Sequence, residues 1–325
     1  MKYRQLGRCG LHVSEIGFGT WGLGGSYGPV DDDVSRETLR HALRRGVTFY
    51  DTSDLYGDGR AEAVLGEALA GQRGRAVVAT KGGMLPHSGF AMPQDFSLTH
   101  LRQAFANSLE RLHSDYVDVY QLHSPTLADL ESNPTVFQWL DRLKRQGRVA
   151  AYGVSVRSPA DGLAILQRWE VDVLQVNFNL IDQRAVESGL LSRAEALGVG
   201  IIARTPLAFG YLSGTMTGRE QLPPGDHRAN WPVDQLERWA SAPRKFAPLN
   251  EGTQRSMVQL ALQYCISQSA VSTVIPGMFS PEQVDENIAA SELGLLSDAE
   301  LGQSAMIYSE NQFFDGGAKS RGVSR

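Results

Sequence analysis

The sequence predicts one α/β domain, residues 1–325, folded as a single (β/α)8 TIM barrel. A leading β-hairpin, a long loop after the seventh strand and an extra C-terminal helix are expected to decorate it. Short apolar segments alternate with helix-like segments along the whole chain, a pattern typical of parallel sheets. The length of 325 residues also suits one barrel, and no linker or low-complexity stretch interrupts the sequence.

The strands follow a hairpin expected at residues 3–13, where Gly7 and Gly10 separate two apolar-polar stretches. Each later strand is expected from a short apolar run bounded by turn residues. The eight runs are residues 15–18, 47–51, 77–81, 117–123, 151–155, 173–177, 200–204 and 273–275.

Helices are expected after the strands, and several carry clear end signals. The helix at 32–45 has acidic residues at its start, basic residues at its end and Gly46 after it. Residues 99–112 repeat apolar side chains at helical spacing, and Pro159 suits the first turn of a helix at 159–168. The others are expected at 61–70, 135–145, 185–196, 253–267 and 281–290, with the extra helix at 298–309.

The longest irregular segment, residues 206–250, follows the seventh strand. It is too long for an ordinary βα loop, and long loops of this kind usually serve a function. Because it follows a strand's carboxyl end, we expect it to overhang the same end of the barrel as the candidate site.

Composition excludes several classes of partner. A net charge of −5 argues against non-specific binding to nucleic acid or anionic membranes. No apolar run reaches signal-peptide length at the N-terminus or the roughly 20 residues of a membrane span. The two cysteines, Cys9 and Cys265, lie far apart, and His87, His100 and His113 lack metal-ligand spacing. We therefore expect a cytoplasmic protein without a metal.

Polar side chains stand at or just after the ends of three successive strands. Asp51 ends one apolar run and Tyr56 follows on its loop, while Lys81 and His123 end the next two. Burying such groups is costly unless they are paired or functional. Catalytic residues of (β/α)8 barrels come from the carboxyl ends of several strands, so these four are the candidate active site.

The residue types suit the reduction of a carbonyl group. Charge that develops on the carbonyl oxygen must be neutralised by a proton, which Tyr56 can donate. We expect the Lys81 ammonium to lower the pKa of Tyr56 and Asp51 to keep Lys81 charged. His123 would donate a hydrogen bond to the substrate oxygen and polarise it.

Three motifs in this order resemble those of the aldo-keto reductases. They are FYDTSDLYG at 49–57, ATK at 79–81 and DYVDVYQLH at 115–123. The resemblance extends from end to end and implies that Asp51, Tyr56, Lys81 and His123 form the family's catalytic tetrad. It also implies nicotinamide-dependent interconversion of carbonyls and alcohols, in either direction. An alternative is a nicotinamide-binding regulatory or sensor protein, similar to potassium-channel β-subunits.

The glycine pattern at residues 17–22 matches a Rossmann fingerprint but precedes a loop rather than a helix, so we reject that interpretation. The resemblance instead implies that Thr20 and Trp21 touch cofactor and substrate. Gln175, which a buried strand would turn inward, is expected to hold the nicotinamide amide. The full set implied to bind cofactor is Thr20, Trp21, Asp51, Ser155, Gln175, Arg204, Pro206, Leu207, Gly210, Gly277, Ser280, Gln283 and Asn287.

The cofactor implied by the resemblance is NADP(H), with NAD(H) as the alternative. Residues 277–283 lack the basic side chains with which many family members hold a 2′-phosphate. Lys319 or Arg321 of the tail could replace them. The expected partner is a small neutral carbonyl or sugar substrate that contacts Trp21, Tyr56 and His123. Further pocket walls are expected from Tyr27, Leu85, Trp231, Phe313 and Phe314.

Overall fold

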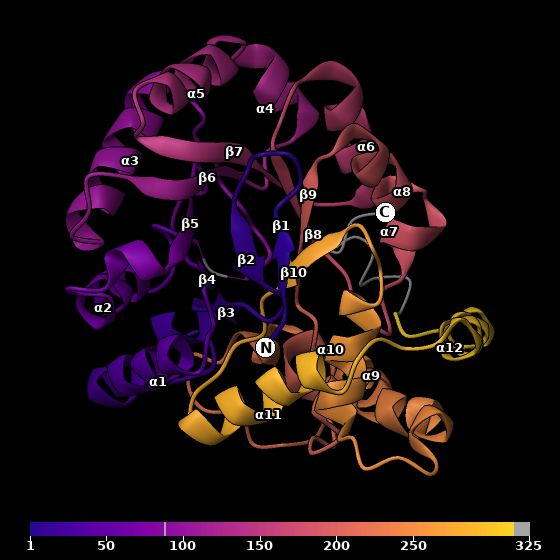
Figure 1. Ribbon diagram of the computed structural model, residues 1–325. Helices are drawn as coiled ribbons and strands as arrows, with labels where there is room; N and C mark the ends of the chain where they lie inside the picture. The colour runs from indigo at the N-terminus through magenta and orange to yellow at the C-terminus, as the bar shows by residue number, and fades with distance from the viewer. Residues whose placement is uncertain (88, 315–325) are drawn as a thin grey trace.

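A computed structural model describes residues 1–87 and 89–314 of the chain. Within these residues, eight parallel strands form one sheet in sequence order from β3 to β10. Parallel bridges from Ile16 to Val274 and from Gly19 to Gly277 bring its two edges together, which closes the barrel (Figure 1). The strands are β3 (Phe18–Gly19), β4 (Phe49–Asp51), β5 (Val77–Gly82), β6 (Val117–His123), β7 (Val149–Ser155), β8 (Val173–Asn177), β9 (Gly200–Arg204) and β10 (Val271–Val274). The predicted barrel is therefore confirmed.

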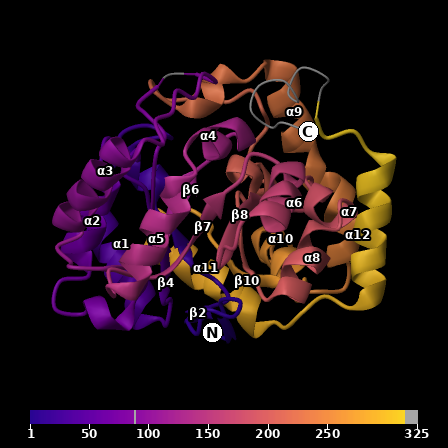
Figure 2. The same ribbon diagram turned by 90° about the horizontal axis from the view of Figure 1, so that it is seen from above.

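Helices surround the barrel, as Figures 1 and 2 show. Their bounds are α1 (Asp32–Arg44), α2 (Arg60–Ala68), α3 (Leu98–Arg111), α4 (Leu127–Ser132), α5 (Thr135–Arg145), α6 (Pro159–Arg168), α7 (Arg184–Glu187), α8 (Leu190–Leu197), α9 (Val233–Phe246), α10 (Met257–Ile266), α11 (Pro281–Glu292) and α12 (Asp298–Glu310). Side-chain caps begin several of them. Asp31 caps α1, for example, and Ser158 caps α6 directly before Pro159.

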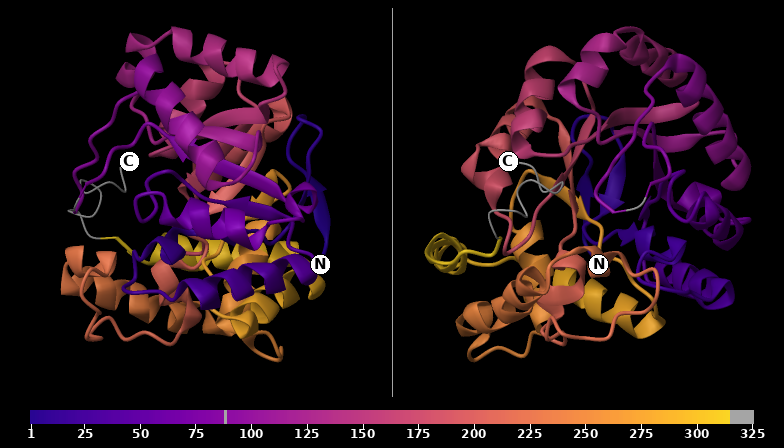
Figure 3. Two further views of the ribbon diagram at one scale, coloured as in Figure 1. Left: turned by 90° about the vertical axis from the view of Figure 1, so that its left-hand side faces the viewer. Right: turned by 180° about the vertical axis from the view of Figure 1, so that it is seen from behind.

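The N-terminal hairpin covers the amino-terminal end of the barrel. Its strands β1 (Tyr3–Gln5) and β2 (His12–Ser14) pair antiparallel and lie in front of the barrel in Figure 1 and at its edge in Figure 3. Leu6 and Val13 pack with the lowest layer of the barrel interior, which includes Val119, Val173 and Ile202. This end is thus filled by apolar side chains, and the opposite end stays open for a site.

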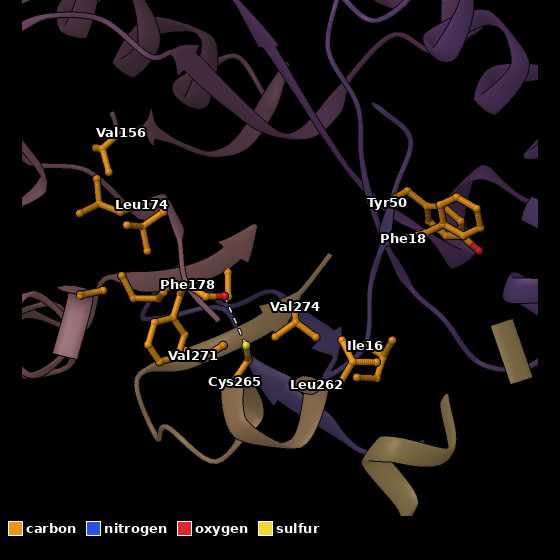
Figure 4. Packing of buried hydrophobic residues seen from close by; sticks show 14 of the residues in the cluster. Ile16, Phe18, Tyr50, Val156, Leu174, Phe178, Leu262, Cys265, Val271 and Val274 are labelled. Atoms are coloured by element: carbon orange, nitrogen blue, oxygen red, sulfur yellow. Dashed lines mark hydrogen bonds between the residues drawn. The ribbon is translucent and has the colours of Figure 1, made fainter. Parts of the chain in front are cut away.

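A larger apolar cluster lies between the strands and the surrounding helices. Figure 4 shows part of it, including Phe18 stacked on Tyr50 with ring centroids 6.1 Å apart. The buried Cys265 thiol donates a hydrogen bond to the carbonyl oxygen of Phe178, 3.3 Å away. In the part of the chain that the structure describes, no helix is long and apolar enough to cross a membrane.

Three features of the structure differ from the sequence prediction. The segment 206–250 is not irregular throughout, because it contains α9 and short 3-10 turns. Pro243 lies inside α9, and burial of one face of α9 outweighs the local cost of a proline in a helix. The helix expected at 185–196 is divided by Gly189, whose φ of 76° is left-handed, and the turn α4 was not expected.

Gly153 in β7 illustrates how closely the strands approach. It pairs with Val173 of β8, and a Cβ atom on Gly153 would lie 1.9 Å from the Val173 carbonyl oxygen. We predict that Gly153→Ala lowers the free energy of unfolding by at least about 2 kcal/mol, because neither strand can move away without breaking the hydrogen bonds between β7 and β8. Urea or thermal unfolding followed by circular dichroism measures the change.

Gly302 provides the matched control for this substitution. It is exposed in α12, and a Cβ atom there would meet no heavy atom within 4 Å. Gly302→Ala should raise the free energy of unfolding by up to about 1 kcal/mol through helix propensity. Equal stability of the two variants would contradict the packing argument.

Candidate active site

A cavity of about 950 Å³ opens at the carboxyl ends of the strands. Its walls come from loops after β3, β5, β9 and β10, and its floor includes Asp51, Tyr56 and His123. The cavity therefore lies where the sequence placed the candidate site.

Lys81 and Asp51 form a buried ion pair at this floor. The Lys81 Nζ atom lies 2.6 Å from Asp51 Oδ2, and their side chains are 0% and 2% exposed. Neighbouring strands β4 and β5 bring the two residues together across the sheet. Nζ also donates to the Thr52 carbonyl oxygen at 2.8 Å and to the Tyr56 hydroxyl at 3.0 Å. All three ammonium protons thus have acceptors, as a buried cation requires.

The Tyr56 ring lies beside this ammonium. Lys81 Nζ is 4.8 Å from the Tyr56 ring centroid, in addition to its hydrogen bond to the hydroxyl. Burial lowers the pKa of Lys81, but the interactions with Asp51 and Tyr56 together outweigh burial, so the net pKa is raised. Lys81 is therefore a cation at neutral pH.

The expected net lowering of the Tyr56 pKa is wrong. Burial raises the pKa of Tyr56 above its ordinary value, and the opposing charge of Lys81 does not overcome burial. The residue is consequently a phenol, not a phenolate, at neutral pH. A phenol still suits proton donation, and Lys81 stabilises the phenolate that remains after the proton has left.

His123 stands at the end of β6 with its ring edge-on to Tyr56, the centroids 6.0 Å apart. Its Nδ1 atom lies 3.1 Å from Ser53 Oγ. Burial, followed by the charges of Lys81 and Arg204, holds the pKa of His123 well below its usual range. The imidazole is therefore neutral and presents one donor and one acceptor nitrogen.

The second oxygen of Asp51 is held by amides that line the barrel interior. Gln175 Nε2 donates to Asp51 Oδ1 at 2.7 Å and Gln121 Nε2 donates to the same atom at 3.4 Å. Gln175 Oε1 accepts from Ser155 Oγ at 3.4 Å. Gln121 was not predicted, although it precedes His123 by two residues and strand alternation points both side chains the same way.

The residues implied to bind cofactor divide into two sets. Those that line the cavity are Trp21, Asp51, Gln175, Arg204, Pro206, Leu207, Gly210 and Gly277. The others lie beneath or beside it. Thr20 donates to the Asp51 carbonyl oxygen, Ser280 caps α11, Gln283 accepts from the Phe279 amide, and Ser155 and Asn287 are buried. Lys319 and Arg321 lie outside the described residues.

Two observations test whether a dinucleotide fits this cavity. Among the described atoms, the buried Nε of Arg204 has no hydrogen-bond partner, and Arg204 is one of the residues that line the cavity. Thr205, Ala208 and Phe209 adopt left-handed φ values of 54°, 45° and 60° in the loop after β9. Such strain in non-glycine residues is typical of ligand clamps. An unpaired buried donor and a strained loop at the cavity are compatible with a bound nicotinamide cofactor.

Four of the side chains expected to form the pocket walls do line the cavity, and three do not. Trp21, Tyr27, Tyr56 and Trp231 line the cavity as expected. Met84 and Pro86 line it in place of Leu85, because neighbours in an extended segment point to opposite sides. Phe313 and Phe314 do not: Phe313 packs on Phe246 and Tyr308, and Phe314 packs on Trp239, which draws the tail into the core beside α9.

A group of rings at the cavity rim was not predicted. His227 lies 4.4 Å from Trp21, 4.9 Å from Tyr27 and 5.0 Å from Phe209, measured between ring centroids. Burial lowers the pKa of His227 to about 4, so its ring is uncharged. His227 belongs to the segment 206–250, whose contacts depend on tertiary packing that sequence spacing does not show.

Among residues 1–87 and 89–314, no group of three or more histidine, cysteine or acidic side chains could hold a metal ion. Besides Asp51, Tyr56, His123 and Gln175, the charged side chains of Arg157, Arg204, Asp226 and Arg228 line the cavity.

The model of the Aldo/keto reductase family matches residues 15–308. L-galactose dehydrogenase of Arabidopsis thaliana is 35% identical over 300 residues, covering 89% of this chain and 88% of that protein. NADH-specific methylglyoxal reductase of Escherichia coli is 31% identical over 92% of this chain and 96% of its own. The holo structure of an aldo-keto reductase from Bacillus halodurans superposes with a TM-score of 0.76 at 32% identity, covering 94% and 96% of the two chains.

One relative has a name of a different kind. A probable voltage-gated potassium channel subunit beta of Oryza sativa is 29% identical over 90% of this chain and 92% of that protein.

Proposed function

The chain belongs to the aldo/keto reductase family, and we propose that it transfers hydride between a nicotinamide cofactor and a carbonyl or alcohol substrate. The observation that carries this proposal is the pair of hydrogen bonds that Lys81 Nζ donates, one to Asp51 and one to the Tyr56 hydroxyl. The hydrogen bond to Tyr56 places a proton donor beside a fixed positive charge at the cavity floor.

In the reductive direction, the substrate oxygen takes the Tyr56 proton while His123 donates a hydrogen bond to it. A bound nicotinamide cofactor would supply the hydride. The phenolate left on Tyr56 is stabilised by the Lys81 ammonium, which Asp51 keeps charged and oriented. In the oxidative direction, the same phenolate accepts the proton of an alcohol.

We propose a neutral aldehyde, ketone or sugar as substrate. Several aromatic side chains line the cavity, among them Trp21, Tyr27, Phe90 and Trp231. Rings of this kind contact apolar surface or the faces of sugars. Relatives named as acting on L-galactose and methylglyoxal are consistent with this class.

We further propose a reducing compartment, the cytoplasm, because both cysteines are free thiols. Nucleic acid and membranes are not among the proposed partners, because the net charge is −5.

The proposed function predicts that Tyr56→Phe lowers kcat at least about a hundredfold, because the phenol hydroxyl is the proton donor. The dissociation constant for the cofactor should stay within about twofold, since Tyr56 is not among the residues implied to bind cofactor. Steady-state kinetics with a panel of aldehydes and sugars, and fluorescence quenching by NADPH and NADH, measure both. A variant that keeps more than about a tenth of the kcat would exclude Tyr56 as general acid.

The same panel separates catalysis from the second candidate, a nicotinamide-binding sensor. The similarity to a probable channel β-subunit favours that candidate. Wild-type protein that binds NADPH or NADH but shows no multiple turnover with any carbonyl would support the sensor.

For the cofactor, we propose that NADP(H) is preferred but discriminated only weakly from NAD(H). Residues 277–283 carry no basic side chain, and Gln283 uses its carbonyl oxygen to accept from the Phe279 amide. A charge-assisted contact with a 2′-phosphate contributes roughly 1.5–3 kcal/mol. A relative named as NADH-specific is consistent with weak discrimination.

Gln283→Arg should therefore tighten NADPH binding by about tenfold to a hundredfold and leave NADH almost unchanged. Gln283→Glu is the matched control, since it keeps the acceptor for Phe279 and should weaken NADPH alone. Dissociation constants for both cofactors are measured by fluorescence quenching. A wild type that already prefers NADPH by a thousandfold would show that another residue holds the phosphate.

A further inference from the structure

Ser53 connects the candidate catalytic histidine to a second carboxyl group. Ser53 Oγ lies 3.1 Å from His123 Nδ1 and 3.1 Å from Asp54 Oδ1. The same oxygen accepts from the Leu55 amide at 3.2 Å, and the Lys81 carbonyl oxygen is a weaker acceptor for the Ser53 hydroxyl at 3.5 Å. The proposed mechanism assigns no role to Ser53 or Asp54, although both lie within hydrogen-bonding reach of the site.

The hydroxyl of Ser53 has one proton and two lone pairs, and the Leu55 amide uses one lone pair. When Asp54 is ionised, it can only accept, so Ser53 donates its proton to Asp54. The remaining lone pair of Ser53 then accepts from His123, which must carry its proton on Nδ1.

The opposite arrangement holds when Asp54 is protonated. Its carboxyl group then donates to Ser53, and Ser53 turns its own proton toward His123 Nδ1. A neutral imidazole that accepts at Nδ1 carries its proton on Nε2. Because the imidazole is neutral, these two tautomers are the states available to His123.

The surroundings of Asp54 favour protonation near neutral pH. Burial, followed by the negative charge of Glu62 on α2, raises the pKa of Asp54 to about 7. Arg111 of α3 opposes this shift but is itself paired with the buried Glu62. The other titratable groups facing the relay are Tyr120 of β6, next to Asp54, and Tyr56, Lys81, Arg204 and His87 around His123.

We propose that Asp54 is a positioning residue that sets the tautomer of His123 through the Ser53 hydroxyl. In this relay, the protonated carboxyl group selects the Nε2–H form and the carboxylate selects the Nδ1–H form. The tautomer switch itself stands on the geometry, whereas its effect on turnover rests on the proposed function. Only the Nε2–H form can donate a hydrogen bond from Nε2 to a substrate oxygen, so catalysis needs protonated Asp54.

The tautomer is measured directly, without cofactor or substrate, by nitrogen-15 NMR of protein labelled at histidine. His123→Asn identifies the His123 signals by their absence. In the wild type, Nε2–H should give way to Nδ1–H with a midpoint near the pKa of Asp54, about 7. In Asp54→Asn, which cannot titrate, the tautomer should not change with pH. Ser53→Ala, which lacks the bridging hydroxyl, should also abolish the pH dependence.

A wild-type tautomer that is constant between about pH 5.5 and pH 8.5, or a pH-dependent switch that persists in both variants, would overturn the proposal. Circular dichroism establishes that each variant is folded, and Ser53→Ala decides the question if Asp54→Asn does not fold. Neither substitution removes a side chain of the tetrad.

Turnover provides the second readout. In the wild type, kcat/KM for carbonyl reduction should fall about tenfold between pH 6 and pH 8, the ratio of protonated Asp54 at the two values. Asp54→Asn should lack this step. A tautomer switch in a protein without turnover would support the relay and refute the proposed function. Turnover with a tautomer that does not change with pH would support the proposed function and refute the relay.

Discussion

The buried ammonium of Lys81 is the constraint on which the candidate site depends. A fully buried cation is unfavourable unless each proton finds an acceptor, and here Asp51, the Thr52 carbonyl oxygen and Tyr56 provide the three. These bonds hold the end of β4, the end of β5 and the following loop in one arrangement. Removing one partner of such a pair typically costs about 3–5 kcal/mol, so the pair shapes the fold as well as the chemistry.

Around this pair, burial in the barrel and nearby charges set the protonation states of the titratable side chains. Burial keeps Tyr56 a phenol and His123 a neutral imidazole, while Lys81 remains a cation. The same burial, with the negative charge of Glu62 nearby, raises the pKa of Asp54 to about 7, so a large fraction of this carboxyl group is protonated at neutral pH. The site thus combines the fixed positive charges of Lys81 and Arg204 with proton donors whose protonation depends on local contacts.

Much of this architecture follows from local patterns. Asp51, Lys81 and His123 could be predicted because polar residues at the ends of apolar strands converge at one end of a parallel barrel. The helix α9 could not, because Pro243 argues against it locally and only tertiary burial stabilises it. The direction of the Tyr56 pKa depends on desolvation, and the contact between Ser53 and His123 joins residues 70 positions apart. Residue spacing reveals neither the direction of this pKa shift nor a contact between residues so far apart in the sequence.

The charge of Lys81 in the intact protein tests this account most directly. Protein labelled with nitrogen-15 at the lysine side chains shows ammonium and amine forms at different shifts, and Lys81→Met identifies the signal. The account predicts that Lys81 is still an ammonium at about pH 9.5 in the wild type, and that Asp51→Asn loses this proton at lower pH. A neutral Lys81 amine in the wild type at about pH 7 would contradict the claim that a buried ion pair organises the site.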